Sequence, residues 1–331
     1  MPGKMDCFGQ TDRGLRRATN EDHFLIADLN KALRIHQTSL NFDDEETLFG
    51  VSQGMMLLVA DGMGGHAAGE HAARLAVESL TSSILNCMPW FFSRDAEGDD
   101  DLRSALERAL HRCQERLQHE AKAHPSVQGM GTTLTAAYVH WPRATVVHAG
   151  DSRCYLLRGG KLRQITRDHT LAQQMVEESE YRSKDLLHSR WANLLWNAIG
   201  SGNESVKPEV HQFDLQLGDV LLLCTDGLTK HIEPAELTDA LSRNLEARAI
   251  CQLLVAQTLA RGGTDNVTAV IAKFVDENPQ SQRLQAMAEQ SIEDVRLQDT
   301  VTEMPAIDPL GEDDAATEKV PVTIPGAPSP N

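Results

Sequence analysis

The chain has 331 residues, of which 31 are Lys or Arg and 48 are Asp or Glu, so its formal net charge is −17. This acidity argues against general binding to nucleic acid or to an anionic membrane surface. Hydrophobic residues make up 41% of the chain, which is enough for a sizeable core. No apolar run reaches the ~18–20 residues of a membrane helix. Because the N-terminus has no apolar signal segment, we expect a cytoplasmic protein.

The predicted elements come in blocks along the chain. A first strand contains Cys7, a hairpin turns at Gly159-Gly160, and helical spacing of apolar residues predicts three helices. The helices are 67–85, 101–122 and 247–260, and the other strands are 23–29, 55–60, 132–140, 144–149, 153–158, 161–165, 208–214, 219–224 and 266–274. Runs of adjacent strands separated by helices predict an α+β fold.

Two long connections and one change of composition divide the chain. Residues 30–54 and 171–205 have no clear period, and long irregular connections in a domain are often functional flaps. Residues 301–331 contain six prolines and six acidic residues, which predicts a disordered tail. We expect a catalytic domain over 1–278 and a linker helix over 279–300.

The six cysteines predict neither a zinc site nor a redox dithiol. They stand at 7, 87, 113, 154, 224 and 251, and no two form a C-x-x-C pair. Most lie in apolar or helical runs, so we expect small buried side chains in a reducing compartment.

Aspartates stand at the ends of strongly apolar strands. Asp61 and Asp226 each follow such a strand and precede a glycine, and Asp265 stands just before the last strand. A single Asp-Gly after a strand is more often a plain turn. Converging aspartates, however, cannot all stay ionised without a compensating cation. The recurrence of the pattern therefore predicts a site for Mg²⁺ or Mn²⁺, which prefer oxygen ligands.

Two further segments add to this pattern. Asp151 follows the strand 144–149 in a Gly-Asp-Ser-Arg sequence, and the segment 11–22 combines Arg16 and Arg17 with acidic residues. The planar arginine fork suits phosphate oxygens, although an isolated pair of arginines is more often solvated surface.

Seven motifs together resemble the metal-dependent protein phosphatases, the type 2C serine/threonine phosphatases, in their bacterial branch. In chain order they occupy residues 11–22, 61–66, 131–133, 150–153, 167–169, 224–228 and 262–268. They read T-D-x-G-x-x-R-x-x-N-E-D, D-G-M-G-G-H, G-T-T, G-D-S-R, R-D-H, C-T-D-G-L and G-G-x-D-N-x-T. Each motif alone is weak, but all seven in the family's order make a chance resemblance improbable.

The resemblance implies a metal site with two or three Mn²⁺ or Mg²⁺ ions. Asp61 would bridge two ions, and the backbone carbonyl of Gly62 would bind one of them. Asp226 and Asp265 would hold the other ion, and Asp151 would help to hold a third.

The resemblance also implies roles beside the metals. Arg17 would bind the substrate phosphate, Glu21 would orient the attacking water, and His66 is a candidate general acid for the leaving alkoxide. Asp22 and Asn266 would brace the site. His169 is assigned to support rather than to chemistry.

The implied fold is a central β-sandwich of two antiparallel sheets flanked by helix pairs, in four αββα layers. The implied function is a phosphoserine/phosphothreonine protein phosphatase that hydrolyses phosphate monoesters with a metal-activated water. Its partners would be phosphorylated proteins and a cognate Ser/Thr kinase, and we expect a monomer that binds neither nucleic acid nor membrane.

Three alternatives stay open from the residues. A non-catalytic phosphoprotein-binding pseudo-phosphatase would keep the fold, but such proteins usually lose a metal-binding aspartate. The site is also compatible with a different phosphomonoester substrate. The spacing of Gly62, Gly64 and Ala67 fits a dinucleotide-binding loop, yet Asp61 would face the pyrophosphate with a negative charge.

Overall fold

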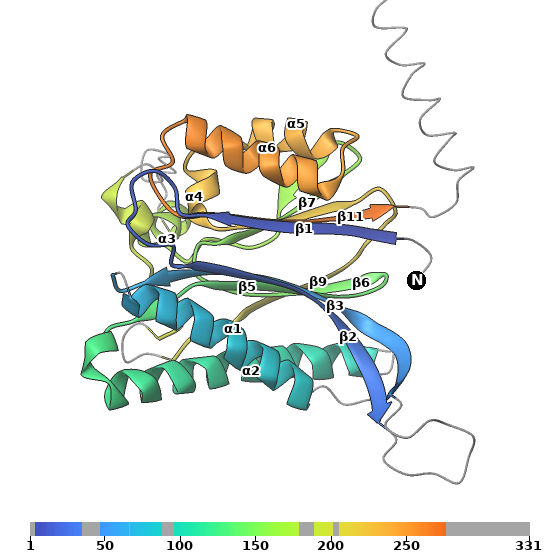
Figure 1. Ribbon diagram of the computed structural model, residues 1–331, viewed down its shortest axis with the longest axis horizontal. Coiled ribbons are helices and arrows are strands. Elements are labelled where there is room, and N and C mark those ends of the chain that lie inside the picture. Colours follow the sequence, from blue (N-terminus) through green and yellow to red (C-terminus); the bar gives the residue numbers. More distant parts are fainter. Residues whose placement is uncertain are drawn as a thin grey trace, which may run out of the picture. The chain divides into compact units, whose positions relative to one another are not determined.

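Two antiparallel β-sheets face each other at the centre of the structure, and helices cover the outer face of each (Figure 1). The computed structural model describes residues 4–34, 47–65, 67–87, 96–178, 189–200 and 205–275. All of them belong to one compact unit, Met1–Glu277. The predicted αββα sandwich is confirmed.

The first sheet has the strand order β1-β11-β10-β7-β8. Its strands are β1 (Lys4–Asp12), β11 (Val267–Val275), β10 (Val220–Cys224), β7 (Arg153–Arg158) and β8 (Lys161–Gln164). The predicted hairpin is the β7–β8 pair, where Gly159 and Gly160 have φ angles of 54° and 73°. Residues with a side chain rarely adopt such angles, which explains the two glycines.

The second sheet has the order β2-β3-β5-β6-β9, and the short β4 (Gly131–Thr132) pairs with β3. The other strands are β2 (Asp22–Arg34), β3 (Thr47–Met63), β5 (Leu134–His140), β6 (Arg143–Ala149) and β9 (Glu209–Asp214).

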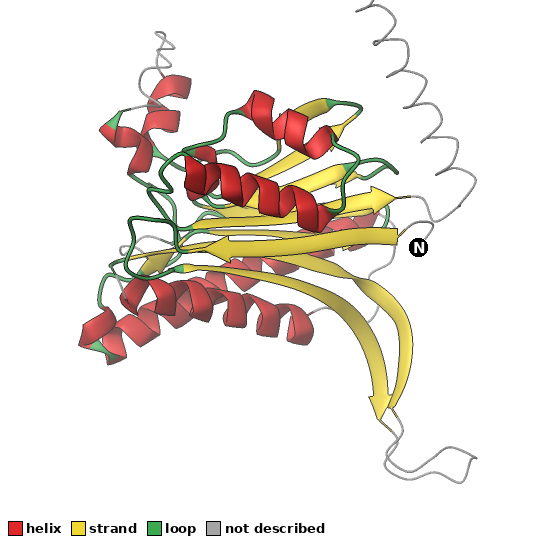
Figure 2. Cartoon of the chain, turned by 45° about the horizontal axis from the view of Figure 1, so that its top comes forward, coloured by secondary structure: helices red, strands yellow, loops and turns green. Residues whose placement is uncertain are grey.

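The predicted irregular connection 30–54 is wrong at both of its ends. β2 continues to Arg34 and β3 begins at Thr47, so the pair forms a long ribbon that extends past the other strands (Figure 2). The pairing shifts register on both sides of Asn30. Because such a shift changes which residues face each side, the sequence there shows no simple alternation.

Each sheet is covered by a pair of helices. α1 (Ala67–Cys87) and α2 (Ala96–Ala123) lie against the second sheet, and α5 (Pro234–Ser242) and α6 (Ala247–Ala260) lie against the first (Figure 1). The shorter helices are α3 (Leu171–Glu178), α4 (Asp226–Thr229), η1 (Pro125–Val127) and η3 (Arg190–Asn193).

All three predicted helices are confirmed, and sequence reasoning missed α3 and α5. α5 carries start signals, since Pro234 stands in its first turn and Glu233 and Glu236 form a capping box. α3 lies inside the stretch 171–205 that we predicted to be irregular, so that prediction is wrong for residues 171–178.

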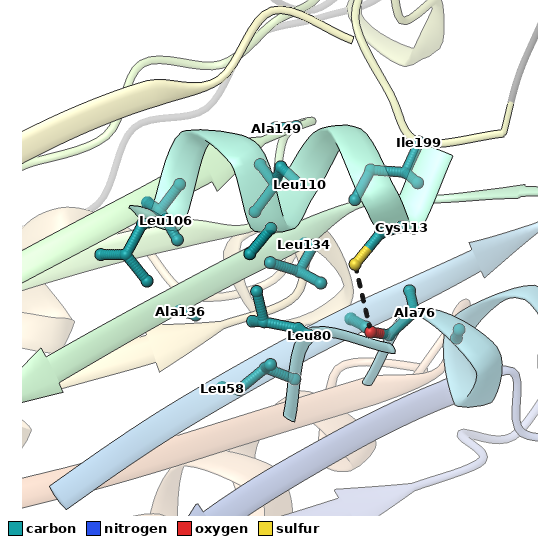
Figure 3. Packing of buried hydrophobic residues seen from close by; sticks show 14 of the residues in the cluster. Leu58, Ala76, Leu80, Leu106, Leu110, Cys113, Leu134, Ala136, Ala149 and Ile199 are labelled. Atoms are coloured by element: carbon teal, nitrogen blue, oxygen red, sulfur yellow. Dashed lines mark hydrogen bonds between the residues drawn. The ribbon is translucent and has the colours of Figure 1, made fainter. Parts of the chain in front are cut away.

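Buried apolar side chains form three layers: one under each helix pair and one between the sheets. Figure 3 shows the layer under α2, where Leu110 is fully buried and the Cys113 thiol donates a hydrogen bond to the Ala76 carbonyl. The cysteines are buried at 113, 154, 224 and 251 and partly buried at 7, and the Cys87 side chain lies outside the described residues.

Several predictions fall on residues that the structure does not describe. These are the linker helix 279–300, the tail 301–331 and the candidate acid His66. Among the described helices, none combines the length and the apolar character that crossing a membrane requires.

Candidate metal centre

The register of the first sheet gathers three of the predicted aspartates at one end. Cys224, the last residue of β10, pairs with the beginning of β7 and with the third residue of β11. Asp226 follows β10 there, Asp265 precedes β11, and Asp151 precedes β7. Three side chains that are far apart in sequence therefore lie at the same end of the strands of this sheet.

The second sheet supplies the remaining carboxylates. Asp22 begins β2 and lies directly opposite Asp61 of β3. Like charges directly opposite each other in an antiparallel pair are destabilising. Strand pairing alone does not favour two facing aspartates, so their presence indicates a functional site.

The electrostatics confirm how closely these groups lie. Burial, followed by the charges of Asp22 and Asp226, raises the pKa of Asp61 well above its ordinary value. Burial raises the pKa of Asp22 to about 7, and burial together with Asp226 raises that of Asp151 well above its ordinary value. A cation among these groups would relieve their repulsion.

Two buried oxygens among them have no hydrogen-bond partner. Asp22 accepts hydrogen bonds of 2.8 Å from the hydroxyls of Thr225 and Thr268, but both go to Oδ2. Its Oδ1 atom and the Oδ1 atom of Asp226 are buried without a partner among the described residues. Unpaired buried carboxylate oxygens are costly, and they are the ligand type that Mg²⁺ and Mn²⁺ take. The donor set thus fits a divalent metal.

Two cationic side chains hold Asp265. The Lys230 ammonium lies 2.8 Å from Asp265 Oδ2 and 2.6 Å from Asp226 Oδ2. Arg17 Nε lies 2.7 Å from Asp265 Oδ1. Burial raises the pKa of Asp265, but Lys230 and Arg17 more than offset this and leave it below its ordinary value. Lys230 was not predicted, although its position four residues after Asp226 is a helical spacing.

Asn266 holds the loop that carries Arg17 and Glu21. Its Oδ1 atom accepts a hydrogen bond of 2.9 Å from the Glu21 backbone N–H. Its Nδ2 atom donates to the carbonyls of Arg13 and Thr19, at 2.8 and 2.9 Å. The buried amide therefore fixes both ends of this loop, which agrees with the bracing role expected for it.

Close backbone packing explains two glycines beside Asp61. A Cβ atom on Gly62 would lie 2.2 Å from the Gly69 carbonyl oxygen. A Cβ atom on Gly69, in the first turn of α1, would lie 1.9 Å from Glu21 Oε2. Glu21 is buried, so its carboxylate sits in space that only a glycine leaves free.

Residues of the G-T-T and G-D-S-R motifs form hydrogen bonds and an ion pair next to Asp61 and Asp151. The Thr133 hydroxyl accepts a hydrogen bond of 3.0 Å from the Asp61 backbone N–H and lies 2.8 Å from the Ser152 hydroxyl. Arg153 forms a two-pronged pair with Asp168, with N···O distances of 2.8 and 2.6 Å.

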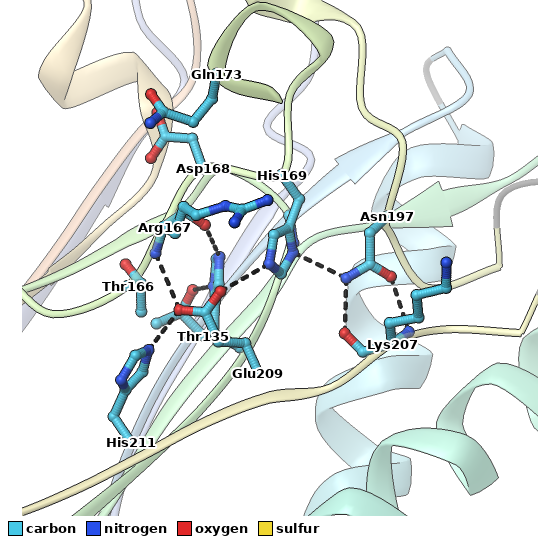
Figure 4. Close-up of polar contacts among 12 residues, drawn as sticks. Thr135, Thr166, Arg167, Asp168, His169, Gln173, Asn197, Lys207, Glu209 and His211 are labelled. Carbon is cyan, nitrogen blue, oxygen red and sulfur yellow. Dashed lines mark hydrogen bonds and ion pairs between the residues drawn. The ribbon is translucent and has the colours of Figure 1, made fainter. Parts of the chain in front are cut away.

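His169 connects the Gly150 backbone with β9 and with residues 189–200. Figure 4 shows its contacts with Glu209 and Asn197. Its Nδ1 atom accepts hydrogen bonds from the Gly150 N–H at 3.1 Å and from the Asn197 amide at 2.9 Å. Its Nε2 atom lies 2.9 Å from Glu209, so the neutral ring carries its proton there. Glu209 was not predicted, and no motif points to it.

The structure thus brings together the predicted carboxylates and both predicted residues of the 11–22 segment. It does not place His66, which lies outside the described residues. Within the described part of the chain, no three His, Cys, Asp or Glu side chains converge closely enough to hold a metal as they stand. The Lys230 ammonium lies between two of these aspartates, Asp226 and Asp265.

Comparisons with known proteins agree with this arrangement. A model of the protein phosphatase 2C family matches residues 34–276. The serine/threonine protein phosphatase PstP of Mycobacterium tuberculosis is 34% identical over 267 residues, which cover 81% of this chain and 44% of PstP. The chain therefore spans less than half of that relative's length.

Two further matches, to one other relative and to the PstP catalytic domain alone, cover nearly the whole of the matched chain. The serine/threonine phosphatase stp of Listeria welshimeri is 28% identical over 264 residues, which cover 80% of this chain and 94% of the relative. A crystal structure of the PstP catalytic domain with two manganese ions is 31% identical, with a TM-score of 0.62, over 82% of this chain and 99% of that one. The chain belongs to the protein phosphatase 2C family.

Proposed function

We propose that the protein is a Mn²⁺- or Mg²⁺-dependent phosphatase that hydrolyses phosphoserine and phosphothreonine in proteins. One observation carries the proposal: aspartates from both sheets gather at one end of the sandwich, where burial and the charges of neighbouring carboxylates raise the pKa of Asp61, Asp22 and Asp151. A bound cation would stabilise the ionised form of this cluster, and phosphate ester hydrolysis is chemistry that divalent cations promote.

The ligands proposed for the metals are those that the motifs indicate. Asp61 and the Gly62 carbonyl would hold one ion, Asp226 and Asp265 a second that Asp61 also touches, and Asp151 would help to hold a third. Divalent ions in this position activate a water for in-line attack and neutralise charge on the phosphoryl group.

The neighbouring side chains position the reactants. The Arg17 side chain is 52% exposed at the rim of the site, and its fork, which here holds Asp265, also matches two phosphate oxygens. Glu21 is buried, and its backbone carbonyl accepts a hydrogen bond from the Gly62 N–H. Its carboxylate would accept a hydrogen bond from the attacking water. Asn266 fixes the distance between these two groups by holding their loop.

We propose His66 as the group that protonates the leaving serine or threonine oxygen. We further propose that residues 1–278 form the catalytic domain, that 279–300 form a linker helix, and that 301–331 form a tail outside catalysis. The protein would act as a cytoplasmic monomer on phosphoproteins of a cognate Ser/Thr kinase.

The test is hydrolysis of p-nitrophenyl phosphate and of a phosphothreonine peptide, with Mn²⁺ and with EDTA. Activity should require Mn²⁺ and should fall at least about a thousandfold in Asp226→Ala. Asp239→Ala is a matched control, because Asp239 pairs with Arg243 on the exposed face of α5 and lies outside the metal centre.

Folded, metal-loaded protein that turns over neither substrate would contradict the proposal. Tight binding of the phosphopeptide without turnover would instead identify a pseudo-phosphatase. Turnover of the aryl phosphate but not of the peptide would point to a different phosphomonoester as substrate.

A further inference from the structure

We propose that Lys230 is a tethered counter-ion that competes with a divalent metal for Asp226 and Asp265. It would therefore set the metal concentration at which this part of the site fills. The inference rests on the metal-dependent function proposed above. It concerns a side chain that none of the seven motifs includes.

The contact geometry places the ammonium between two proposed metal ligands. Lys230 Nζ lies 2.6 Å from Asp226 Oδ2 and 2.8 Å from Asp265 Oδ2. Asp226 follows β10 and Asp265 precedes β11, so the lysine links residues at the ends of two different strands. A small, compact cation in this position is a monovalent substitute for a metal.

The backbone of α4 brings Lys230 next to Asp226. Asp226 begins the short helix α4, and the Lys230 N–H donates a 2.9 Å hydrogen bond to the Asp226 carbonyl. Residues four apart on a helix lie on the same face, so the ammonium reaches its own helix-start aspartate without any loop movement. The side chain is 32% exposed, which leaves it a path toward solvent when it is displaced.

The lysine satisfies the site only in part, so a metal can still displace it. Asp226 Oδ1 remains buried without a hydrogen-bond partner in the described structure. If a divalent ion binds Asp226 and Asp265 together through their Oδ2 atoms, it takes the place that the ammonium occupies. Two cations cannot share these atoms at such distances, so Lys230 has to leave.

The opposite role for Lys230 makes a different prediction. If the lysine served mainly to hold the two aspartates in position for the metal, removing it would weaken metal binding. If it competes, removing it tightens metal binding. The sign of the change in affinity therefore decides between the two roles.

The first experiment measures Mn²⁺ binding to the full chain by calorimetry, without substrate. We expect Lys230→Gln to lower the dissociation constant for Mn²⁺ at least about tenfold, because the neutral side chain no longer occupies the carboxylates. Lys161→Gln is the matched control for the change in net charge, since Lys161 is exposed on β8. It should change the dissociation constant less than about twofold.

The second experiment needs no substitution. Lysines of the wild-type chain are acetylated with and without Mn²⁺, and the labelled sites are read by mass spectrometry. We expect labelling of Lys230 to rise several-fold with Mn²⁺ as its amine leaves the carboxylates, whereas labelling of Lys161 should not change. This readout decides the matter even if Lys230→Gln does not fold.

Unchanged or weaker Mn²⁺ binding in folded Lys230→Gln, or labelling of Lys230 that does not rise with Mn²⁺, would overturn this inference alone. A wild-type chain that binds no Mn²⁺ would overturn it together with the proposed function. The two failures are distinguishable because neither measurement depends on turnover.

Discussion

Asp22 lies directly opposite Asp61 in the antiparallel register of β2 and β3. The charge of Asp22 raises the cost of ionising Asp61, and both carboxylates have pKa values above the ordinary range, to which burial makes the largest contribution. In the metal-free protein, ionised carboxylates therefore repel one another at this end of the sandwich. A bound cation removes the repulsion, which links metal binding to stability.

The raised pKa of Asp22 predicts that the metal-free protein loses stability between pH 4 and pH 7. Its pKa is about 7 in the fold against an ordinary 3.8, so in this range the folded protein holds a proton that the unfolded chain has released. The free energy of unfolding then falls as the pH rises. Asp22→Asn cannot ionise. In EDTA it should be more stable than wild type by about 1–3 kcal/mol at pH 7.5, and within about 0.5 kcal/mol at pH 4.5.

Urea unfolding at the two pH values measures this difference. Asp28→Asn is the matched control for the loss of one carboxylate, because Asp28 is exposed on the same strand. An Asp22→Asn variant that is less stable than wild type at pH 7.5 would contradict the prediction.

Metal binding should stabilise the fold through Asp61. At a free Mn²⁺ concentration 100 times the dissociation constant, the free energy of unfolding of wild type should rise by about 2.7 kcal/mol for each site filled. Asp61→Asn should be more stable than wild type in EDTA, because a repelling charge is gone. The same variant should lose most of the increase with Mn²⁺. Thermal unfolding with and without Mn²⁺ measures both effects, and an increase equal to that of wild type would exclude Asp61 as a ligand.

Most of the strands could be predicted from the sequence, because their apolar runs and glycine turns are local features. The αββα layers were implied only by the resemblance to the type 2C phosphatases. The α3 and α5 helices were missed because they are short, and the β2–β3 ribbon was missed because its register shifts at Asn30. A ribbon of this kind is set by pairing between strands, which a pattern along one strand does not contain.

The residues of the candidate site also fall into two groups: those that a local sequence pattern indicates and those that only the fold brings together. Asp61 and Asp226 could be found because each stands at the end of an apolar strand beside a glycine. Lys230, Glu209 and Gly69 act through contacts with residues distant in sequence, such as Lys230 with Asp265 and Gly69 with Glu21. Only the folded arrangement shows those partners.

Asn266 should control activity through the loop that it holds. Asn266→Ala removes hydrogen bonds to the Glu21 N–H and to two carbonyls, and leaves these groups without their partner. We expect the free energy of unfolding to fall by about 2–4 kcal/mol and kcat/KM for p-nitrophenyl phosphate to fall at least about tenfold, because Arg17 and Glu21 lose their fixed position.

Two further variants define what Asn266 does. Asn266→Asp keeps the acceptor for the Glu21 N–H but loses both amide N–H donors. Its free energy of unfolding and its kcat/KM should therefore lie between those of Asn266→Ala and wild type at low pH. Asn86→Ala is the surface control, since that exposed amide donates hydrogen bonds to Ser82 within α1. Full activity in Asn266→Ala would show that the loop is held by other contacts.

Gly69 and Glu21 should be strongly coupled. Replacing a helical glycine by alanine usually stabilises a protein by about 0.5–1 kcal/mol. At Gly69 the added Cβ atom would lie 1.9 Å from Glu21 Oε2, and this carboxylate is buried and cannot simply swing into solvent. Gly69→Ala should therefore destabilise the fold by about 1–3 kcal/mol and also lower kcat/KM. In a Glu21→Ala background the same substitution should cost less than about 0.5 kcal/mol, because the two nearest atoms belong to the Glu21 carboxyl group and the third, the Gly62 carbonyl carbon, lies 3.0 Å away. A double-mutant cycle with urea unfolding measures the coupling, and equal costs in the two backgrounds would mean that Glu21 does not occupy the space beside Gly69.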